Sequence, residues 1–232
     1  MSDWVSFWDS KHSVYVSARH LEAHYRRIAD DLLRYVPEGG TVLDYGCGGA
    51  RAHDRLATAA ARLVLCDAAP GVRASLAERF SHSSKIEVDA PEDIEALPSG
   101  EIDLIAMHSV AQYLSPEQLH QTLLLFWRLL HPDGVLLLGD VIPPDVSPVT
   151  DATALLRFAG KEGFLTAAVT GLARTAFSNY ARLRSTLGLT HYSEQTMIAK
   201  LADAGFKAER APHNIGHNPS RMTFLARPDN SR

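Results

Sequence analysis

The chain has 232 residues, of which 46% are hydrophobic and 22% charged, which is the length and composition of one soluble globular domain with a substantial core. Its formal net charge of −4 argues against a nucleic-acid partner that is held mainly through phosphate contacts. Two cysteines, no signal-like start and no apolar run of about 18 residues predict a cytoplasmic protein without a disulfide framework or a membrane span.

A helix precedes the first predicted strand, because Leu21, Tyr25, Ile28 and Leu32 recur at helical spacing. Five short apolar segments then alternate with helical ones, at residues 41–44, 62–67, 85–88, 102–107 and 135–140. Near-continuous apolar strands that alternate with helices are typical of βαβ units in a parallel sheet.

The second half of the chain begins with a helix whose start is marked by a capping box at Ser115. A helical stretch over about 150–187 follows, and we expect glycines to interrupt it at Gly160, Gly163 and Gly171. A last helix is capped by Ser193, and two strands at 206–212 and 222–227 pair as a hairpin across the loop 214–220.

These elements predict an α/β fold: a Rossmann-like, doubly wound sheet of about seven strands, mostly parallel, with a C-terminal antiparallel hairpin. We expect one domain made of four parts: a helical extension or lid (1–40), the core (41–140), a helical insertion (143–190), and the final helix and hairpin (191–232). The aromatic residues that crowd the N-terminus either fold over a ligand or pack against the body.

A glycine-rich turn follows the first strand and carries the most specific signal. Asp44 ends the apolar run, and Gly46, Cys47 and Gly48 follow it. Glycines there permit backbone angles closed to other residues and a close approach of a ligand to the main chain. We expect a helix from about Ala50, with free N–H groups that point into the same crevice.

Asp67 ends the second strand, about twenty residues after the turn, where a carboxylate accepts both hydroxyls of a ribose. The alternative is a strand-end aspartate that caps the helix near Pro70. The spacing from the glycine turn favours the ribose interpretation.

Five segments in this order resemble the motifs of class I S-adenosylmethionine-dependent methyltransferases, close to the small-molecule group called type 11. They are Val42–Gly48, Leu63–Asp67, Val88–Ala90, Asp103–Leu114 and Leu129–Leu138. The resemblance implies the activity and S-adenosylmethionine as cofactor, with S-adenosylhomocysteine as product. It also implies the cofactor contacts: the turn (Asp44, Gly46, Cys47, Gly48) at the methionine portion, Asp67 at the ribose, Ala68, Asp89 and Ala90 at the adenine, and His108 after the fourth strand.

The turn departs from the family pattern at its third glycine, which is Ala50 here. A methyl group is small and we expect position 50 to begin a helix, so cofactor binding should survive. Methyl transfer needs mainly alignment, so a base is optional. The candidates beside the acceptor are His108 (or a structural histidine that lines the cofactor site), Gln112 as an orienting group, and Asp140.

No metal site is predicted. His20 and His24 are four residues apart on a helix, but no glutamate directly follows the first histidine and no third ligand is evident. The acceptor is expected to be a small molecule, apolar if the insertion covers it; Phe164 and Phe177 belong to the apolar side of that insertion. Homodimer formation and contact with a membrane surface are alternatives for the same segment.

Two other functions share part of the signal. A nicotinamide-dependent Rossmann oxidoreductase would use the same turn and ribose acid, but it would leave the segments around Asp89 and His108 unexplained. A non-catalytic, methyltransferase-like scaffold or regulator would bind the cofactor without turnover.

Overall fold

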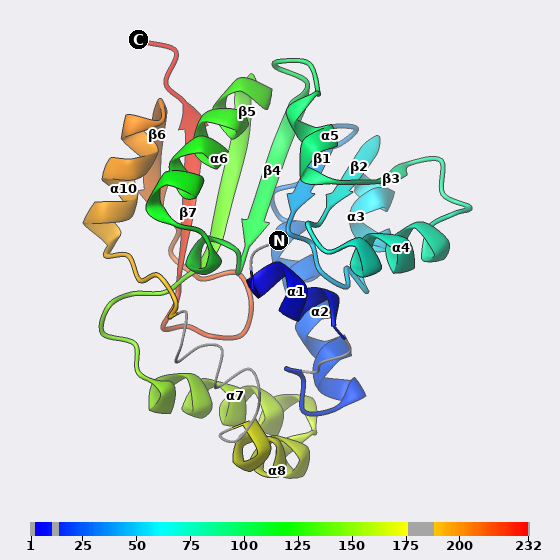
Figure 1. Cartoon of the computed structure of the whole chain (residues 1–232), viewed down its shortest axis with the longest axis vertical. Helices are drawn as coiled ribbons and strands as arrows, with labels where there is room; N and C mark the ends of the chain where they lie inside the picture. Colours follow the sequence, from blue (N-terminus) through cyan, green and yellow to red (C-terminus); the bar gives the residue numbers. More distant parts are fainter. Residues whose placement is uncertain (1–2, 11–13, 176–187, 232) are drawn as a thin grey trace.

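Seven strands form one mixed sheet in the order β3-β2-β1-β4-β5-β7-β6 (Figure 1). The computed structural model describes residues 3–10, 14–175 and 188–231. The strands are β1 (Thr41–Tyr45), β2 (Arg62–Cys66), β3 (Ile86–Asp89), β4 (Ile102–His108), β5 (Leu130–Val141), β6 (Phe206–Arg210) and β7 (Met222–Pro228). Strands β1 to β5 pair in parallel, and β7 runs antiparallel between β5 and β6, so the predicted fold class is confirmed.

Helices surround this sheet, and several of them begin where the sequence signals place them. They are α1 (Asp3–Asp9), α2 (Ala18–Leu32), α3 (Asp54–Ala59), α4 (Pro70–Arg79), α5 (Pro91–Glu95), η1 (Ala111–Tyr113), α6 (Pro116–Leu129), α7 (Pro148–Glu162), α8 (Leu165–Thr175) and α10 (Glu194–Asp203). At the start of α6, Ser115 accepts a hydrogen bond from the Gln118 N–H, and the Gln118 side chain accepts one from the Ser115 N–H. The predicted capping box is therefore present.

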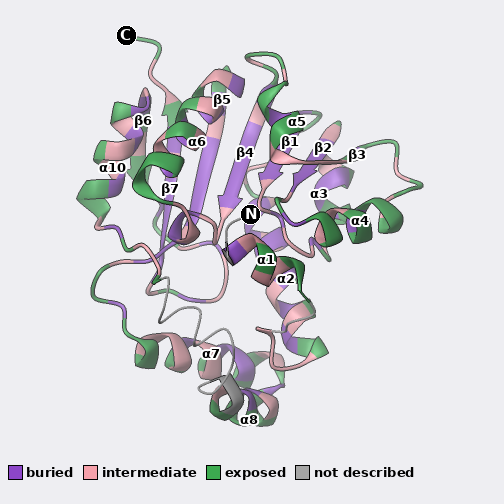
Figure 2. Ribbon diagram, in the orientation of Figure 1, coloured by how far each residue is buried: buried purple, intermediate pink, exposed green. Residues whose placement is uncertain are grey.

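The core has two layers, one on each face of the sheet. Helices α5, α6 and α10 bury their apolar faces against one side, where Phe126 and Phe224 are fully buried. Helices α2, α3 and α4 cover the other side, around Leu56 and Leu76. Figure 2 shows the buried strands between helices whose outer faces are exposed. Burial on both faces is the reason why the strands read as continuous apolar runs.

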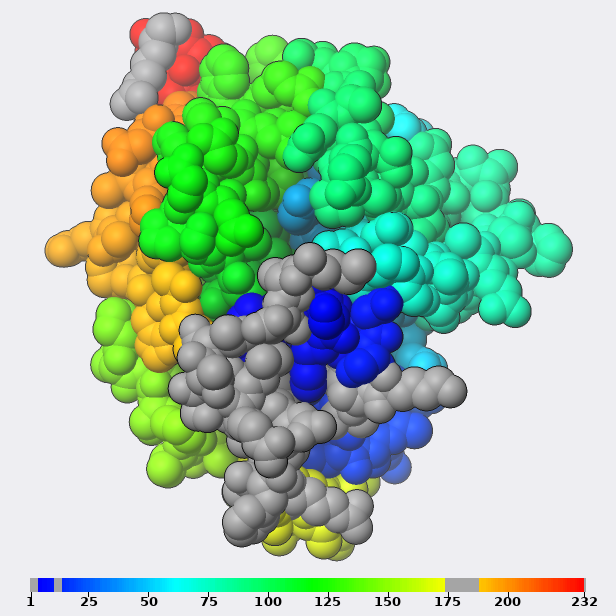
Figure 3. Space-filling view, in the orientation of Figure 1, coloured from blue at the N-terminus to red at the C-terminus, as the bar shows by residue number. Residues whose placement is uncertain are grey.

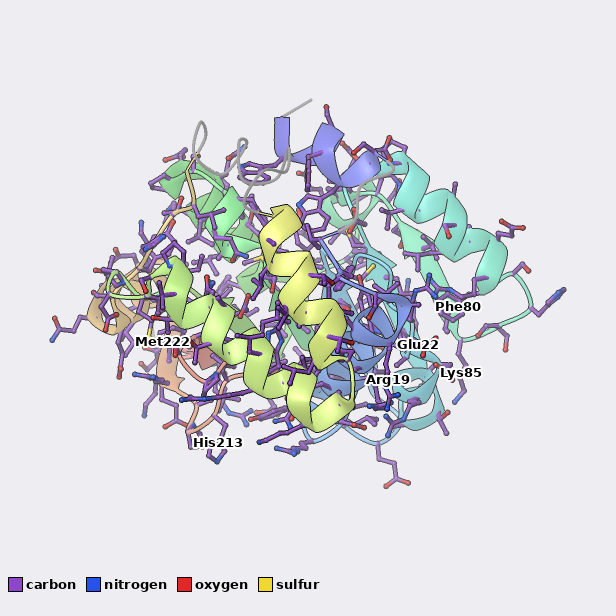
Figure 4. All side chains as sticks on the ribbon, turned by 90° about the horizontal axis from the view of Figure 1, so that it is seen from below. Arg19, Glu22, Phe80, Lys85, His213 and Met222 are labelled. Carbon is purple, nitrogen blue, oxygen red and sulfur yellow. The ribbon has the colours of Figure 1, made fainter. Side chains whose placement is uncertain are left out.

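The insertion folds into α7 and α8, which lie below the carboxyl ends of the parallel strands in Figure 1. Gly163 ends α7 in a left-handed conformation (φ 75°), beside the Arg19 side chain (Figure 4). The expected interruptions at Gly160 and Gly171 were wrong, because both glycines lie inside continuous helices. Gly171 packs closely on Val16, where a Cβ would lie 2.2 Å from Val16 Cγ1.

A partly buried ion pair attaches the insertion to the sheet. The Arg221 guanidinium at the start of β7 donates to both carboxylate oxygens of Asp151 in α7 (2.8 and 2.7 Å). The Phe158 and Phe164 side chains pack with Ala23 of α2 in a small separate cluster. Phe177 and the predicted helical residues up to 187 lie outside the described residues. Among the described residues, no helix is long and apolar enough to cross a membrane.

Candidate functional site

A cavity of about 250 Å³ lies at the carboxyl ends of β1, β2 and β4. Helix α1 closes it on the outside, and Figure 3 shows α1 between α6 and α4 on this face of the molecule. The strand order reverses between β1 and β4, so the connections that leave these two strands run to opposite sides and open a crevice at their carboxyl ends. The wall contains the predicted residues Asp44, Gly46, Cys47, Gly48, Asp67, Ala68 and His108, and also Trp4, Trp8, Tyr15, His24, Tyr25, His53 and Tyr113.

The glycine turn is held against β2 and needs glycine at two positions. The N–H groups of Gly46 and Cys47 both donate to the Cys66 carbonyl (2.7 and 3.0 Å). Gly46 has φ 80° and Gly48 has φ 54°. A Cβ on Gly46 would lie 2.3 Å from Val110 Cγ2, and one on Gly48 would lie 2.8 Å from the Tyr25 hydroxyl. Left-handed geometry and lack of space therefore both exclude larger side chains.

Ala50 does not begin a helix, so that expectation was wrong. Its φ is 38°, in the left-handed region, and α3 begins four residues later at Asp54. Two left-handed residues in close succession, Gly48 and Ala50, prevent a right-handed helix from starting at the turn. The N–H groups of the turn are also not free: Gly48 donates to Asp67 (2.9 Å) and Gly49 donates to the Tyr25 hydroxyl (2.6 Å).

Asp67 connects the turn to the start of α4. Its Oδ2 accepts the Gly48 N–H and its Oδ1 accepts the Ala69 N–H, each at 2.9 Å. Burial raises the pKa of this carboxyl group, and the two N–H donors oppose that shift. Asp67 is not the N-cap of α4, which is Ala69, but its bond to the Ala69 N–H anchors the chain just before that helix. Each carboxylate oxygen keeps a further lone pair for a ligand hydroxyl.

Asp44 forms a buried pair with His53, which the sequence analysis missed. Asp44 is 4% exposed and His53 is 1% exposed. The His53 Nε2 lies 2.6 Å from Asp44 Oδ2. His53 stands in the stretch that was expected to be helical, and no motif in the sequence singles it out.

His108, Ser109 and Asp140 meet where β4 and β5 end side by side. The Ser109 hydroxyl donates to Asp140 Oδ2 (2.7 Å) and lies 3.1 Å from His108 Nδ1. The His108 Nε2 donates to the Ile215 carbonyl (3.1 Å). Ser109 and Asp140 have φ values of 59° and 60°, so two non-glycine residues hold left-handed conformations together. Such outliers gather at functional sites.

Residues 43–138, which span β1 to most of β5, match the family described as "Methyltransferase domain". A SAM-dependent methyltransferase from Aquifex aeolicus is 17% identical, with a TM-score of 0.58 over 97% of this chain and 96% of its own. The structure of a complex of DhpI with SAH is 13% identical, with a TM-score of 0.61 over 97% of this chain and 95% of its own. Residues 43–138 of this chain are therefore a methyltransferase domain, and the chain as a whole shares the fold of S-adenosylmethionine-dependent methyltransferases.

A third neighbour is a putative methyltransferase in complex with the Haloferax volcanii Trm112 methyltransferase activator. It is 15% identical, with a TM-score of 0.60 over 89% of this chain and 91% of its own. The chain spans 66% of a longer neighbour, a possible exported protein from Bordetella parapertussis. At these identities the structural likeness shows the fold alone. No curated protein matches the chain.

Four predicted site residues lie outside the cavity wall, although Pro91, next to Ala90, belongs to it. Asp89 ends β3 next to Cys66, and burial raises the pKa of its carboxyl group. Ala90 donates its N–H to Asp93 (3.0 Å) at the start of α5. Gln112 is 6% exposed in η1, and its Oε1 has no hydrogen-bond partner among the described residues. Asp140 also lies behind the wall and reaches the cavity through Ser109.

Histidines from three elements gather beside the cavity. The rings of His20, His24 and His217 are 6.0 to 6.3 Å apart, and His108 is 6.4 Å from His24. His24 lines the cavity, and no described residue makes a hydrogen bond to it. Burial, followed by the neighbouring histidines, lowers the pKa of His24 well below 6.5. Over residues 3–10, 14–175 and 188–231, no group of three or more His, Cys, Asp or Glu side chains is arranged to hold a metal ion.

Proposed function

We propose that this protein transfers a methyl group from S-adenosylmethionine to a small-molecule acceptor and releases S-adenosylhomocysteine. The observation that carries the proposal is that Asp44 and Asp67 line one cavity, at the ends of adjacent parallel strands, with the glycine turn between them. Ligands of the nucleotide type bind at this place in open α/β sheets. Most of the cavity wall, from Asp44 to Gln118, also belongs to the methyltransferase domain.

The residues present fit the parts of this cofactor. Gly46, Cys47 and Gly48 bring the main chain of the turn to the cavity wall, where a ligand can approach it closely. Asp44 offers the methionine portion a buried carboxylate, and Asp67 offers lone pairs to the ribose hydroxyls. We propose Ala68, Asp89 and Ala90 for the adenine, at the rim near Pro91.

S-adenosylmethionine supplies a methyl group on a sulfur that is already positively charged, so the protein has mainly to align the acceptor and exclude water. Trp4, Trp8 and Tyr113 exclude water by closing the outer wall. The Ser109 hydroxyl is fixed by Asp140, and the Ile215 carbonyl holds the His108 ring in one orientation by accepting its Nε2 hydrogen. His24, which lacks a hydrogen bond from any described residue, accepts the proton that an acceptor loses when its nucleophilic atom takes the methyl group.

The acceptor is proposed to be small, uncharged and partly apolar. The part of the wall beside the glycine turn consists of aromatic rings and histidines, among them Tyr15 and His24. The pKa values of His20, His24 and His217 all lie below 6.5, so these rings carry no charge at neutral pH. We propose that α7 and α8 cover the acceptor; a homodimer contact or a membrane surface is the alternative use of this segment. A net charge of −4 argues against nucleic acid as the acceptor.

Calorimetry with S-adenosylmethionine, S-adenosylhomocysteine and NAD tests the proposal. We expect micromolar binding of the first two and none of NAD. No binding of either sulfur ligand would overturn the proposal, and binding of NAD alone would favour the oxidoreductase. Binding of the sulfur ligands without transfer to any of a broad set of hydroxyl and amine acceptors would favour the scaffold.

Asp67→Ala tests the ribose contact. The substitution removes a charge-assisted hydrogen bond worth about 1.5–3 kcal/mol, so we expect S-adenosylhomocysteine to bind at least about tenfold more weakly. Asp67 also accepts the N–H groups of Gly48 and Ala69, and Asp67→Asn keeps an acceptor for only one of them. Urea denaturation of both variants therefore separates a loosened turn from a lost ribose contact. An affinity that neither substitution changes would contradict the ribose assignment.

A further inference from the structure

In the buried pair of Asp44 and His53, the two oxygens of the Asp44 carboxylate have different surroundings. Oδ2 is occupied, because a carboxylate only accepts hydrogen bonds and His53 Nε2 lies 2.6 Å away with its hydrogen. Oδ1 has no hydrogen-bond partner among the described residues, although Asp44 is 4% exposed. Asp44 belongs to the cavity wall, so this oxygen faces the ligand side. A carboxylate this deeply buried is unfavourable unless a positive donor completes it.

The position of His53 gives its side chain no other evident task. His53 is the N-cap residue of α3, but its side chain makes no capping hydrogen bond there. Nδ1 is buried and has no partner among the described residues. The bond to Asp44 is thus the single hydrogen bond that its ring makes within the described part of the chain.

We propose that His53 is a positioning residue for the amino-acid end of the cofactor: it fixes Oδ2 of Asp44 so that Oδ1 points at the α-ammonium group of the methionine portion. This inference rests on the proposed function and deepens it. The ammonium group supplies the positive donor that the free oxygen lacks, and the fixed carboxylate binds it without first having to be ordered. His53 itself does not contact the cofactor in this arrangement.

Two ligands separate this role from a purely structural one. S-adenosylhomocysteine carries the ammonium group, whereas 5′-methylthioadenosine shares the adenosine and the sulfur but lacks the amino-acid portion. Calorimetry of both ligands is carried out on wild type, His53→Leu and His53→Gln. Leucine keeps the bulk and removes the donor, and the glutamine amide restores an N–H at about the position of Nε2.

We expect His53→Leu to bind S-adenosylhomocysteine about tenfold to about 100-fold more weakly, and 5′-methylthioadenosine within about twofold of wild type. His53→Gln should recover most of the lost affinity. Asp44→Asn should show the same selective loss, and Asp44→Asn with His53→Leu should add little to it, because the two residues act as a unit.

Equal losses for both ligands, or an unchanged affinity for S-adenosylhomocysteine, would overturn the role of His53 and leave the proposed function intact. Wild type that binds neither ligand would overturn the proposed function and this inference together. Partial unfolding of a variant does not change the comparison of the two affinities, because both ligands are measured on one sample. A smaller folded fraction lowers the stoichiometry for both and leaves the ratio of the two affinities unchanged.

Discussion

At the scale of single residues, the glycine turn combines two constraints that mutation can separate. Gly46 has a left-handed φ and also lies against Val110, whereas Gly39 has a similar φ of 67° with no atom within 4 Å of the position of a Cβ. Substitution of Gly39 by alanine therefore measures the free-energy cost of the left-handed backbone alone. The same substitution at Gly46 measures that cost plus the cost of a steric overlap.

Gly46→Ala should destabilise the protein by about 3 kcal/mol, against about 1 kcal/mol for Gly39→Ala, since left-handed geometry costs about 1–2 kcal/mol and overpacking a similar amount. Urea denaturation measures both. Val110→Ala in the Gly46→Ala background should restore part of the difference. Equal costs for the two glycine substitutions would show that the contact with Val110 is not what restricts the turn.

The residues of the site differ in how far the sequence could predict them. Asp44, Gly46, Gly48 and Asp67 were found because a strand end, a glycine turn and a spacing of about twenty residues are local signals, and all four line the cavity. His53 and His24 were missed as site residues because their places depend on folding. His53 reaches Asp44 through a turn that resembled a helix in sequence, and His24 meets His217 across the whole chain.

At the scale of elements, α1 is attached to the body at both rims of the cavity. The Trp4 and Trp8 rings contact Tyr113 of η1 at centroid distances of 4.6 and 6.0 Å. On the other side, the Asp9 carboxylate accepts the N–H of Gly71 at the start of α4. An acid at a helix N-terminus is favourable for both the hydrogen bond and the helix dipole.

Asp9→Ala should loosen α1 without unfolding the protein, because the lost cap contributes about 1 kcal/mol. Acrylamide quenching of tryptophan fluorescence should increase, since Trp4 and Trp8 line the cavity beneath α1. The measurement is best made with Trp127→Phe, because Trp127 is 44% exposed and would dominate the signal. Asp203→Ala, at an exposed position in α10, is the matched control. An equal increase in quenching in that variant would show that the effect does not come from loosening of α1.

The order of the elements was more predictable than their boundaries. Continuous apolar strands, the capping box at Ser115 and the stop at Gly205 are local chemistry, and the structure has each of them. The expected break at Gly171 was wrong because packing outweighs the weak helix propensity of glycine: Gly171 lets α8 approach Val16 closely. Gly160 is exposed in α7 with no atom within 4 Å of the position of a Cβ, so only its weak helix propensity acts there, and that does not break the helix. The helix that we expected from Ala50 begins later, because the left-handed conformation of the turn before α3 prevents an earlier start.

At the scale of the whole molecule, the histidine cluster makes folding depend on pH. It joins α2, the end of β4 and the loop before β7, and Phe158 and Phe164 stack on it at 4.7 and 4.9 Å. Burial is the first cause that lowers the pKa of each of three histidines, to about 4 for His20. Around His217, Asp140 and Asp151 oppose this shift, and Arg221 and His108 add to it.

The direction in which stability changes with pH follows from the protons that the folded and unfolded chains bind. The unfolded chain binds protons at these histidines below about pH 6.5, whereas the folded chain resists them until a lower pH, so the unfolded state binds more protons in between. Stability should therefore be constant above about pH 7 and fall as the pH drops from about 6.5 to about 4. His20 alone would contribute about 2 kcal/mol, since a pKa unit is worth about 1.4 kcal/mol and some exposure of the ring reduces the effect.

Urea denaturation at pH 7.5, 6.0 and 5.0 measures how steeply the free energy of unfolding falls with pH. Variants show which residues cause this slope. His20→Phe removes the titrating ring but keeps the stacking on Phe164, so it should flatten the slope between pH 6.5 and pH 5. His82→Phe, at an exposed position, should leave the slope unchanged. A slope that persists in His20→Phe and in a matching His217→Phe would assign the acid sensitivity to carboxylates instead. Because the cluster borders the cavity at His24, the same acidification should also weaken cofactor binding before the protein unfolds.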